Sequence, residues 1–470
     1  MPFYRISLFE RRASKTISHF CKAPTNQENT YRQFLCASFV AGLLLAWTSS
    51  GILRVPPVWA GPPPGSTTST LPVLTLAQAI RLGLTRNPGL EGERARILRD
   101  QARSVEVGEL QDPRIVVGEQ YFPFNFNMGT SVLTMTTVGV RQDFPPWGKR
   151  ALLHKNAANE EKAARWNLDD KKALLVRNIR ISWLDLYQAR QQESILRSVG
   201  ALWQKAFQAA LGRYRQGTGS ESDVLLAQYQ KDSLRDKMEE IRIGKEKSLH
   251  RLMNLLHVAR PFRISSEKPR IPDPLPESVL LKRINDHPAI EYGVSKDNAQ
   301  EFRVRSAERD KIPAISVEGD YSYFMGPNLI TSTPNLFSVL LTFNLPVRPG
   351  ERQDQKVAEE EHTLNMLEAG LETKRQRFIE EIRDSEGIYR HLLSRTAILD
   401  RILVSEARRN VEASLAGYET GTLEMGQVLS AMEQVENVKL RALSVRTDLL
   451  KTSAKLSYLS GILQGGLHEP

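Results

Sequence analysis

Two very long stretches of this chain contain no proline. The first lies between Trp147 and Arg260 and the second between Gly350 and Glu469, and all 25 prolines of the 470 residues lie outside them. Because proline breaks the interior of a helix, its absence over such lengths permits very long helices. We expect helices at about 150–213, 221–257, 352–417 and 423–463.

Apolar residues recur every seven positions in the second stretch. One ladder holds Leu364, Leu371, Phe378, Leu392 and Leu399, with Ser385 as its only polar step. Another, four residues on, holds Ile382, Tyr389 and Leu403. A seven-residue repeat favours coiled-coil packing, so each half of the chain is predicted to contain a long antiparallel coiled-coil hairpin. Helices at 89–111 and 289–311 would supply the length that the shorter arm lacks, by stacking end to end with it.

The turn of each hairpin carries the same motif. The stretch RYRQGTGSESDVLLAQYQ begins at Arg213, and GYETGTLEMGQVLSAMEQ begins at Gly417. Other landmarks repeat at offsets that grow slowly from 200 to 204 residues, which indicates a tandem duplication rather than chance. The matched pairs are Pro88 with Pro288, Pro113 with Pro313, Gly148 with Gly350, Tyr214 with Tyr418, and Gly217 with Gly421.

Each half also contains two candidate strands, at 114–123 and 131–144 and at 313–346. In AISVEGDYSYF, which begins at Ala314, apolar and polar residues alternate, and LFSVLLTFNLP alternates in the same way. The runs are about as long as a transmembrane β-strand, and their aromatic ends favour a lipid-facing barrel over a soluble hairpin with one buried face.

Four strands cannot close a barrel, and backbone in lipid must be fully hydrogen-bonded. Two copies would give eight strands, whose interior side chains fill the barrel, and three would give twelve strands with an open lumen. The predicted fold class is therefore mostly α with a β-barrel portion: two tandem repeats, each contributing two strands to a trimeric twelve-stranded barrel.

The first sixty residues have the layout of a secretory signal peptide. Basic residues precede the apolar run Phe34–Trp47, and a small-residue site at Ala60 and Gly61 follows. A membrane anchor is the alternative, but the run is short. The predicted segments are a signal peptide (1–60), a Pro/Gly-rich linker (61–73), a first repeat (74–260), a Pro-rich linker (261–276), a second repeat (277–464) and a tail (465–470).

Composition excludes several classes of function. Both cysteines, Cys21 and Cys36, lie in the leader, so the mature chain would have no disulfide, no thiolate metal site and no catalytic cysteine. Neither cysteine follows a lipidation motif, and no lipid anchor is expected. Without the leader the net charge falls from +10 to about +5, which gives little support to nucleic-acid binding.

No catalytic, cofactor-binding or metal-binding constellation is recognisable. RQGTGSES lacks the Gly-Lys-Ser/Thr ending of a phosphate loop. His250 and His257 are seven residues apart, whereas a helical metal pair usually needs a spacing of four. Met425 and Met432 are seven residues apart, a spacing at which methionines usually pack in a helical core. We expect no enzyme activity, no cofactor and no metal site.

The order of these motifs resembles the outer membrane efflux proteins of the TolC family, over about residues 72–464. The features that carry the resemblance are LTLAQAIRLGLTRNPGL from Leu74, DFPPWGKR before the first long helix, and the duplicated Tyr-Gly turn motif. The Gly148-Lys149-Arg150 form is similar to members that serve heavy-metal pumps of the resistance–nodulation–division type.

The resemblance implies a passive exit duct in the cell outer membrane. It implies a homotrimer with a large periplasmic helical portion, joined to an inner-membrane transporter by a periplasmic adaptor. The two turns would form the periplasmic tip, which closes the entrance and meets the adaptor. The residues expected at this tip are Tyr214, Gly217, Thr218, Glu221, Asp223, Tyr418, Gly421, Thr422, Glu424 and Gln427.

The tip departs from the family pattern. Gln427 and Ser430 occupy places where relatives carry aspartates that select cations, and Leu423 stands where TolC itself has a basic latch residue. Glu221 and Glu424 are candidates for supplying the negative charge instead; the alternative is that they stabilise helix N-termini.

Two other functions remain open from the sequence. One is a similar channel that works with a type I protein-secretion transporter. The other is a secreted coiled-coil scaffold without a barrel, and the strand pairs are the feature that separates it from a membrane channel.

Overall fold

The computed structural model describes residues 71–124, 126, 133–324 and 335–462. The expected signal peptide and C-terminal tail lie outside these residues. The described residues belong to one compact unit. Its α-helices are α3 (Leu76–Arg86), α4 (Pro88–Glu106), α5 (Lys149–Arg215), α6 (Glu221–Leu256), α7 (Glu277–Lys282), α8 (Pro288–Glu308), α9 (Gln353–Ile398), α10 (Val404–Glu419) and α11 (Met425–Leu459).

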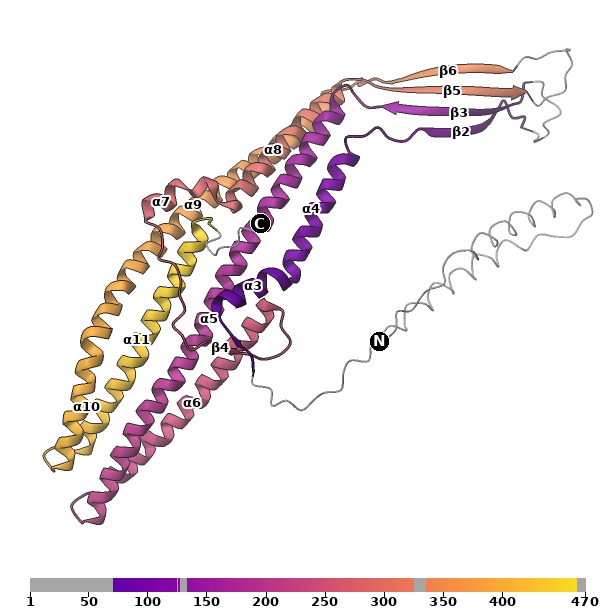
Figure 1. The fold of residues 1–470 in the computed structure, drawn as a ribbon. Helices are drawn as coiled ribbons and strands as arrows, with labels where there is room; N and C mark the ends of the chain where they lie inside the picture. The colour runs from indigo at the N-terminus through magenta and orange to yellow at the C-terminus, as the bar shows by residue number, and fades with distance from the viewer. Residues whose placement is uncertain (1–70, 125, 127–132, 325–334, 463–470) are drawn as a thin grey trace, which may run out of the picture. The chain divides into compact units, whose positions relative to one another are not determined.

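Helix α5 is the central element of the helical part (Figure 1). Its 67 residues make it roughly 100 Å long at about 1.5 Å per residue. It packs against α4, α6, α8 and α11, whereas α9 packs against α8 and α11. Among the described residues, no helix is both long and apolar enough to cross a bilayer.

Coiled-coil spacing explains how α5 joins the two hairpins. Its buried residues toward the tip follow alternating steps of three and four residues: Leu196, Val199, Trp203, Ala206 and Ala210. These side chains belong to one apolar core with residues of α6, α10 and α11. The last two seam positions of α5 toward the tip are alanines, Ala206 and Ala210, so that the helices can approach closely there.

The predicted helix at 352–417 is not one continuous α-helix. A π-helical turn at Leu399–Leu403 separates α9 from α10. The span from Gly350 to Gly421 is two residues longer than the span from Gly148 to Gly217, and a π turn accommodates extra residues inside a helix. The turn also shifts the register, so Leu403, predicted on a packing ladder, is 38% exposed.

Two short helices are joined end to end with longer ones. Asn87 caps α4 by accepting from the N–H of Gly89, and its side chain also donates to the carbonyl of Leu255 in the last turn of α6. In the second half, His287 caps α8 and contacts the carbonyl of Tyr458 in α11. Each joint therefore makes one long strut from two helices, as the predicted helix lengths require.

A two-stranded pairing lies in the segments predicted as linkers. Strand β1 (Val73–Leu74) pairs in parallel with β4 (Arg263–Ile264), which the sequence did not indicate. The pairing adds Ile264 and the neighbouring Phe262 to the apolar core between α3, α5 and α6. The segment at 261–276 is therefore partly ordered by contact with the start of the described chain.

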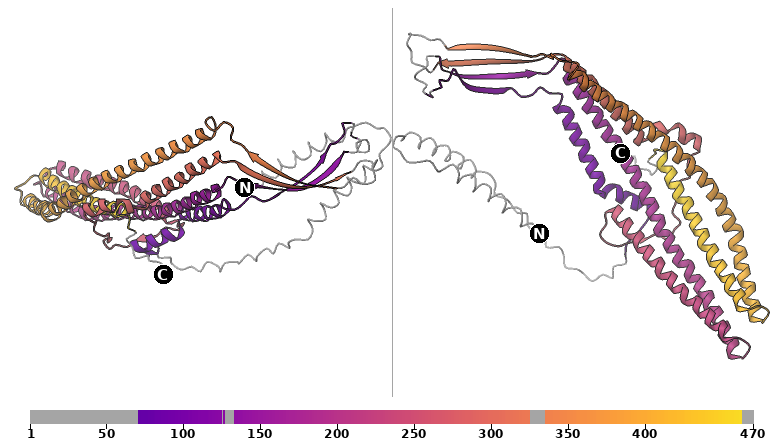
Figure 2. Two further views of the ribbon diagram at one scale, coloured as in Figure 1. Left: turned by 90° about the horizontal axis from the view of Figure 1, so that it is seen from above. Right: turned by 180° about the vertical axis from the view of Figure 1, so that it is seen from behind.

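The remaining strands form one antiparallel sheet at the end of the helical part away from the tips (Figures 1 and 2). The strands are β2 (Arg114–Gln120), β3 (Met135–Phe144), β5 (Ala314–Phe324) and β6 (Leu336–Asn344), and the order in the sheet is β2-β3-β5-β6. The described strands do not close on themselves, so β2 and β6 are edges without a strand partner among the described residues.

The two faces of this sheet differ in chemistry. Across the strands, Val117, Val138, Tyr321 and Phe337 are aligned partners and are between 48% and 73% exposed. The next row on this face holds Ile115, Val140, Gly319 and Val339. An apolar face this large is unusual for a soluble protein, and it marks an interaction surface.

The opposite face of the sheet is mainly polar over β3 and β5, whereas β6 places Leu336 and Leu340 on it. Arg141 donates to Asp143 at 3.0 Å and to Ser316 at 3.3 Å, and Ser316 donates to Asp143 at 2.6 Å. Nearer the far end, the hydroxyls of Thr137 and Ser322 are 2.9 Å apart and buried. These hydrogen bonds join β3 to β5 across this face, whereas the buried Oδ1 of Asp320, on the same face, has no hydrogen-bond partner among the described residues.

Candidate functional site at the helix tips

The two hairpin turns have the same backbone geometry. Gly217 has φ +72° and Gly421 has φ +79°, in the left-handed region that favours glycine. The N–H of Gly217 donates to the carbonyl of Tyr214, and that of Gly421 donates to the carbonyl of Tyr418. Each turn thereby closes the end of a long helix with the same hydrogen bonds.

The threonines that follow the glycines have equivalent roles. The hydroxyl of Thr218 donates to the carbonyl of Arg213 at 3.2 Å, and the hydroxyl of Thr422 donates to the carbonyl of Gly417 at 2.9 Å. These contacts occupy carbonyls that the end of a helix leaves without an intrahelical partner. The main structural role of the Gly-Thr pair is therefore to end the helix.

Tyr418 connects the two hairpins within one protomer. Its side chain is 1% exposed, and its hydroxyl donates to the carboxylate of Asp223 at 3.1 Å. Burial and the neighbouring Asp223 carboxylate raise the pKa of Tyr418 to about 12, so its hydroxyl keeps its proton and donates at neutral pH. The tyrosine comes from the end of α10 and the aspartate from the first turn of α6.

Arg213 is the tip residue that sequence reasoning missed. Its guanidinium donates to the carbonyl of Tyr418 at 2.6 Å and to the carbonyl of Thr218 at 3.2 Å, and it lies 4.7 Å from the centre of the Tyr418 ring. The family pattern predicts a basic residue directly after the second Gly-Thr, where this chain has Leu423. The cation instead comes from the other hairpin, one residue before Tyr214.

The other predicted tip residues have different surroundings. Tyr214 occupies the position in its turn that Tyr418 occupies in the other, but its side chain is 47% exposed whereas that of Tyr418 is buried. Glu221 lies in the first turn of α6, and Glu424 is the residue before α11, where its side chain makes no capping hydrogen bond. Glu221, Glu424 and Gln427 are all exposed. The structure brings Asp223, Tyr418 and Arg213 together and leaves these three at the surface.

The methionines near the tip pack in the core. Met425 and Met432 are both fully buried, in the apolar cluster that joins α5, α10 and α11. Flexible thioether side chains fill irregular gaps well, which suits the place where two hairpins meet. They have no open surface along which an ion could pass.

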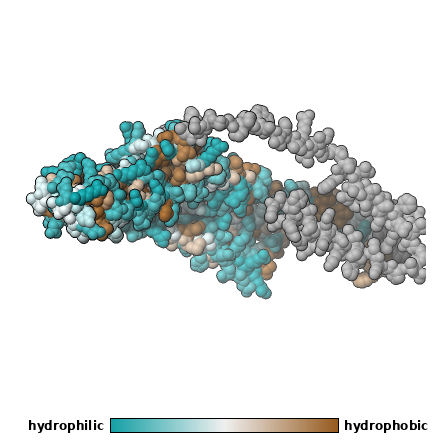
Figure 3. Space-filling model, turned by 90° about the horizontal axis from the view of Figure 1, so that it is seen from below, coloured by the Kyte–Doolittle hydropathy of each residue, from teal (hydrophilic) through white to brown (hydrophobic). Residues whose placement is uncertain are grey.

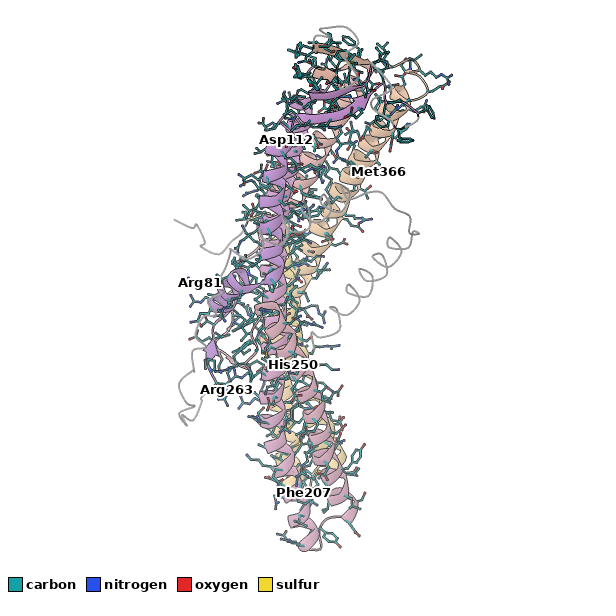
Figure 4. All side chains as sticks on the ribbon, turned by 90° about the vertical axis from the view of Figure 1, so that its right-hand side faces the viewer. Arg81, Asp112, Phe207, His250, Arg263 and Met366 are labelled. Carbon is teal, nitrogen blue, oxygen red and sulfur yellow. The ribbon has the colours of Figure 1, made fainter. Side chains whose placement is uncertain are left out.

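The two histidines considered as a metal pair are exposed and separate. His250, labelled in Figure 4, lies on α6, whereas His257 is the residue at which that helix ends. Within the described ranges, no three His, Cys, Asp or Glu side chains are grouped so that they could hold a metal ion. In Figure 3 the helical part presents a mainly hydrophilic surface with smaller hydrophobic areas.

Residues 287–461 match the family model described as outer membrane efflux protein. This part of the chain, which includes α8 to α11 and the second turn, is therefore similar to that family. The resemblance drawn from the sequence is confirmed there. A search of curated protein sequences finds no match to this chain.

Solved structures share the fold over most of the chain. The outer-membrane channel OprN has a TM-score of 0.70 and 18% identity, covering 82% of this chain and 90% of its own. The outer membrane protein VceC from Vibrio cholerae has a TM-score of 0.69 and 17% identity, covering 82% and 96%. A membrane protein from Pseudomonas aeruginosa has a TM-score of 0.71 and 18% identity, covering 86% and 95%.

These identities show the shared fold. The predicted location in the cell outer membrane agrees with the family that residues 287–461 match and with the channels that have this fold. Efflux transport is the activity of that family, and its members are channels rather than enzymes.

Proposed function

We propose that three copies of this chain form the outer-membrane exit duct of a tripartite efflux system. The duct conducts solutes passively from an inner-membrane pump of the resistance–nodulation–division type, through a periplasmic adaptor, to the cell exterior. The observation that carries the proposal is the four-stranded sheet, with an exposed apolar face, a mainly polar face and two edges that have no strand partner in the described part of the chain.

The edge strands of the sheet are the reason that copies of the chain would assemble. Unpaired backbone groups in lipid cost several kcal/mol each, so β6 of one copy must pair with β2 of the next. Three copies give a twelve-stranded barrel whose apolar face meets lipid and whose Arg141–Asp143 network lines the lumen. Three copies are favoured over two, because an eight-stranded barrel would be filled by its own side chains. The family resemblance also implies a trimer.

The tips of the helices form the periplasmic entrance in this assembly. Tyr418, Asp223 and Arg213 lock the two hairpins of each protomer together and hold the entrance narrow. Opening separates the hairpins and breaks these contacts. The surface of the turns, with Glu221, Glu424 and Gln427, is the part that the adaptor contacts.

Crosslinking tests the barrel directly. In a chain with Cys21 and Cys36 replaced by serine, V117C in β2 is combined in turn with F337C, V339C or L341C in β6. Within one copy, edge strands are separated by three strand spacings, roughly 14 Å, so a disulfide between them can form only between copies. We expect oxidised dimers and trimers on a denaturing gel, and no larger species.

The control pair lies inside one copy. Val138 and Tyr321 are direct partners of β3 and β5, so V138C with Y321C should give a crosslinked monomer. If the control closes but every edge pair remains monomeric in outer membranes, the trimeric barrel is wrong. Pull-down of the intact trimer from crosslinked cells, followed by identification of the transporter that accompanies it, tests the assignment to a pump.

A further inference from the structure

Three chain segments meet where the sheet joins the helices. They are Pro145–Arg150 at the start of α5, Arg309–Pro313 after α8, and Leu345–Lys356 at the start of α9. Their residues line a cavity of about 580 Å³. Ion pairs hold the segments together, because the carboxylate of Asp310 binds the ammonium groups of both Lys149 and Lys356.

These segments carry an excess of positive charge. Seven of their side chains are basic and three are acidic: Lys149, Arg150, Arg309, Lys311, Arg348, Arg352 and Lys356 against Asp310, Glu351 and Asp354. Burial alone would raise the pKa of Asp310, but hydrogen bonds from Lys149 and Lys356 hold it below its usual value. Asp310 thus stays ionised and compensates only part of the charge.

Two of these cations have no partner within the described part of the chain. Arg309 lies beside Gly148, where a Cβ would be 4.0 Å from its guanidinium, and Arg352 lines the cavity; neither makes an ion pair or side-chain hydrogen bond with a described residue. Arg352 lines the cavity, and Arg309 directly precedes Asp310, which also lines it; two exposed guanidinium groups without a described partner at this junction favour a ligand with negative charge.

Large apolar side chains are exposed at the same place. Trp147 is 88% exposed, Val347 is 84% exposed and Leu345 is 67% exposed. Leu345 continues the alternation of the apolar residues of β6, so the apolar face of the sheet extends to this junction. A second cavity here, of about 1030 Å³, is lined by Phe144, Trp147 and Ile315 among others.

The combination fits the headgroup and acyl chains of a phospholipid. Arginine binds phosphate with two parallel hydrogen bonds, and tryptophan is enriched at the level of lipid headgroups. Acyl chains can continue along the apolar face that begins at Leu345.

We propose that this junction is a binding site for an anionic phospholipid of the periplasmic leaflet, with its phosphate held by Arg309 and Arg352 and its chains lying beside Trp147 and Leu345. The inference rests on the proposed function, since it places the sheet in the outer membrane. The bound lipid fixes the depth at which the helices leave the bilayer.

The test compares lipids bound to the full chain in nanodiscs. Nanodiscs contain equal amounts of phosphatidylglycerol and phosphatidylcholine, and native mass spectrometry counts the lipids that stay bound to the released protein. We expect the wild type to retain mainly phosphatidylglycerol. The R309Q/R352Q variant removes no ion pair between described residues, and it should retain phosphatidylglycerol about tenfold less tightly.

Two further variants make the result specific. R81Q/R270Q removes two other exposed arginines that make no ion pair with described residues, and its lipid retention should match the wild type. Trp147→Ala should weaken retention of both lipids, because it changes the apolar part of the site. Equal retention by the wild type and R309Q/R352Q would overturn the inference.

The outcome also separates this inference from the proposed function. If the wild type forms conducting trimers in nanodiscs but shows no preference for the anionic lipid, only the lipid site is wrong. If R309Q/R352Q no longer forms trimers, the junction is a contact between copies, which also overturns the lipid site. If the wild type neither forms trimers nor inserts, the proposed duct itself is wrong.

Discussion

His287 joins two helices that are far apart in the sequence. Its Nδ1 accepts from the N–H of Ala289 at 3.1 Å, so Nε2 carries the proton and donates to the carbonyl of Tyr458, also at 3.1 Å. Burial lowers the pKa of His287, which keeps the ring neutral at pH 7. Phe378 and Tyr458 pack edge-on against the ring, with centroids 4.7 and 5.1 Å away.

Removing this imidazole should destabilise the protein strongly. His287→Ala leaves a buried cavity, an uncapped helix and a carbonyl without its donor, and we expect a loss of about 3 kcal/mol in unfolding free energy. His287→Asn introduces the residue found at Asn87, which makes the equivalent contacts in the first half, and it should recover part of that loss. Denaturant unfolding followed by circular dichroism checks both variants; equal stability of the two would contradict a capping role.

The lock at the tip predicts a change in channel current. Tyr418→Phe keeps the packing but removes the hydroxyl that donates to Asp223, and Asp223→Asn removes the charge of the acceptor. A lost hydrogen bond of about 1 kcal/mol corresponds to roughly a fivefold increase in open probability. Single-channel recording in planar bilayers measures it. The matched control is Tyr214→Phe in the exposed tyrosine, which should leave the current unchanged, and a closed Tyr418→Phe channel would argue against the lock.

Replacing the turn glycine Gly217 should lower stability, and Gly212, five residues before it, provides the control. Gly217→Ala should cost about 1 kcal/mol, because φ is +72° although no atom lies within 4 Å of the added Cβ. Gly212 lies inside α5, also has open space around it, and does not have positive φ. Gly212→Ala should therefore stabilise the helix by about 1 kcal/mol. Thermal melting of both variants should give shifts of opposite sign.

Charge at the entrance predicts ion selectivity. Glu221 and Glu424 are exposed at the starts of α6 and α11, and three copies would place six such carboxylates around the opening. Replacing both by glutamine should reduce the preference for cations over anions severalfold. Reversal potentials under a salt gradient measure the preference, and an unchanged value would show that these carboxylates only stabilise the helix ends.

Asp297 predicts a pH dependence of stability. Burial and the nearby Glu368 carboxylate raise the pKa of Asp297 from 3.8 to about 6. A carboxyl group whose pKa is raised by folding stabilises the folded state below its unfolded pKa, and this contribution disappears as the pH rises through about 6. Asp297→Asn should thus be more stable than the wild type at pH 8 by roughly 1 kcal/mol, after allowance for partial solvation, and similar to it at pH 4. Melting curves at both pH values test the sign.

Much of the architecture follows from local patterns. The absence of proline and the heptad ladders place the long helices within four residues of their bounds in the structure, with Phe378 and Ile382 buried as a coiled coil requires. Alternation in AISVEGDYSYF places β5 at the same residues and separates Tyr321 from Ser322 on opposite faces. These features depend on periodicity, which a single sequence displays directly.

The remaining features depend on contacts between distant segments. The π turn arises from fitting two extra residues into α9 and α10, which no local pattern marks. The pairing of β1 with β4 involves only two residues per strand, too few to show alternation. Arg213 was missed because its partner, Tyr418, is 205 residues away on the other hairpin. Closure of the sheet and the role of the tip residues remain predictions.

The open edges of the sheet impose an order on the biogenesis of this protein. A newly exported copy carries β2 and β6 with free backbone groups and an apolar face toward water, which is the signature of a chain prone to aggregate. If copies assemble as proposed, such a copy would need an escort while it is alone, and it would reach a state compatible with lipid only when the ring of strands closes. Insertion and assembly would then be a single event, and an excess of unassembled copies would be removed by proteolysis rather than stored.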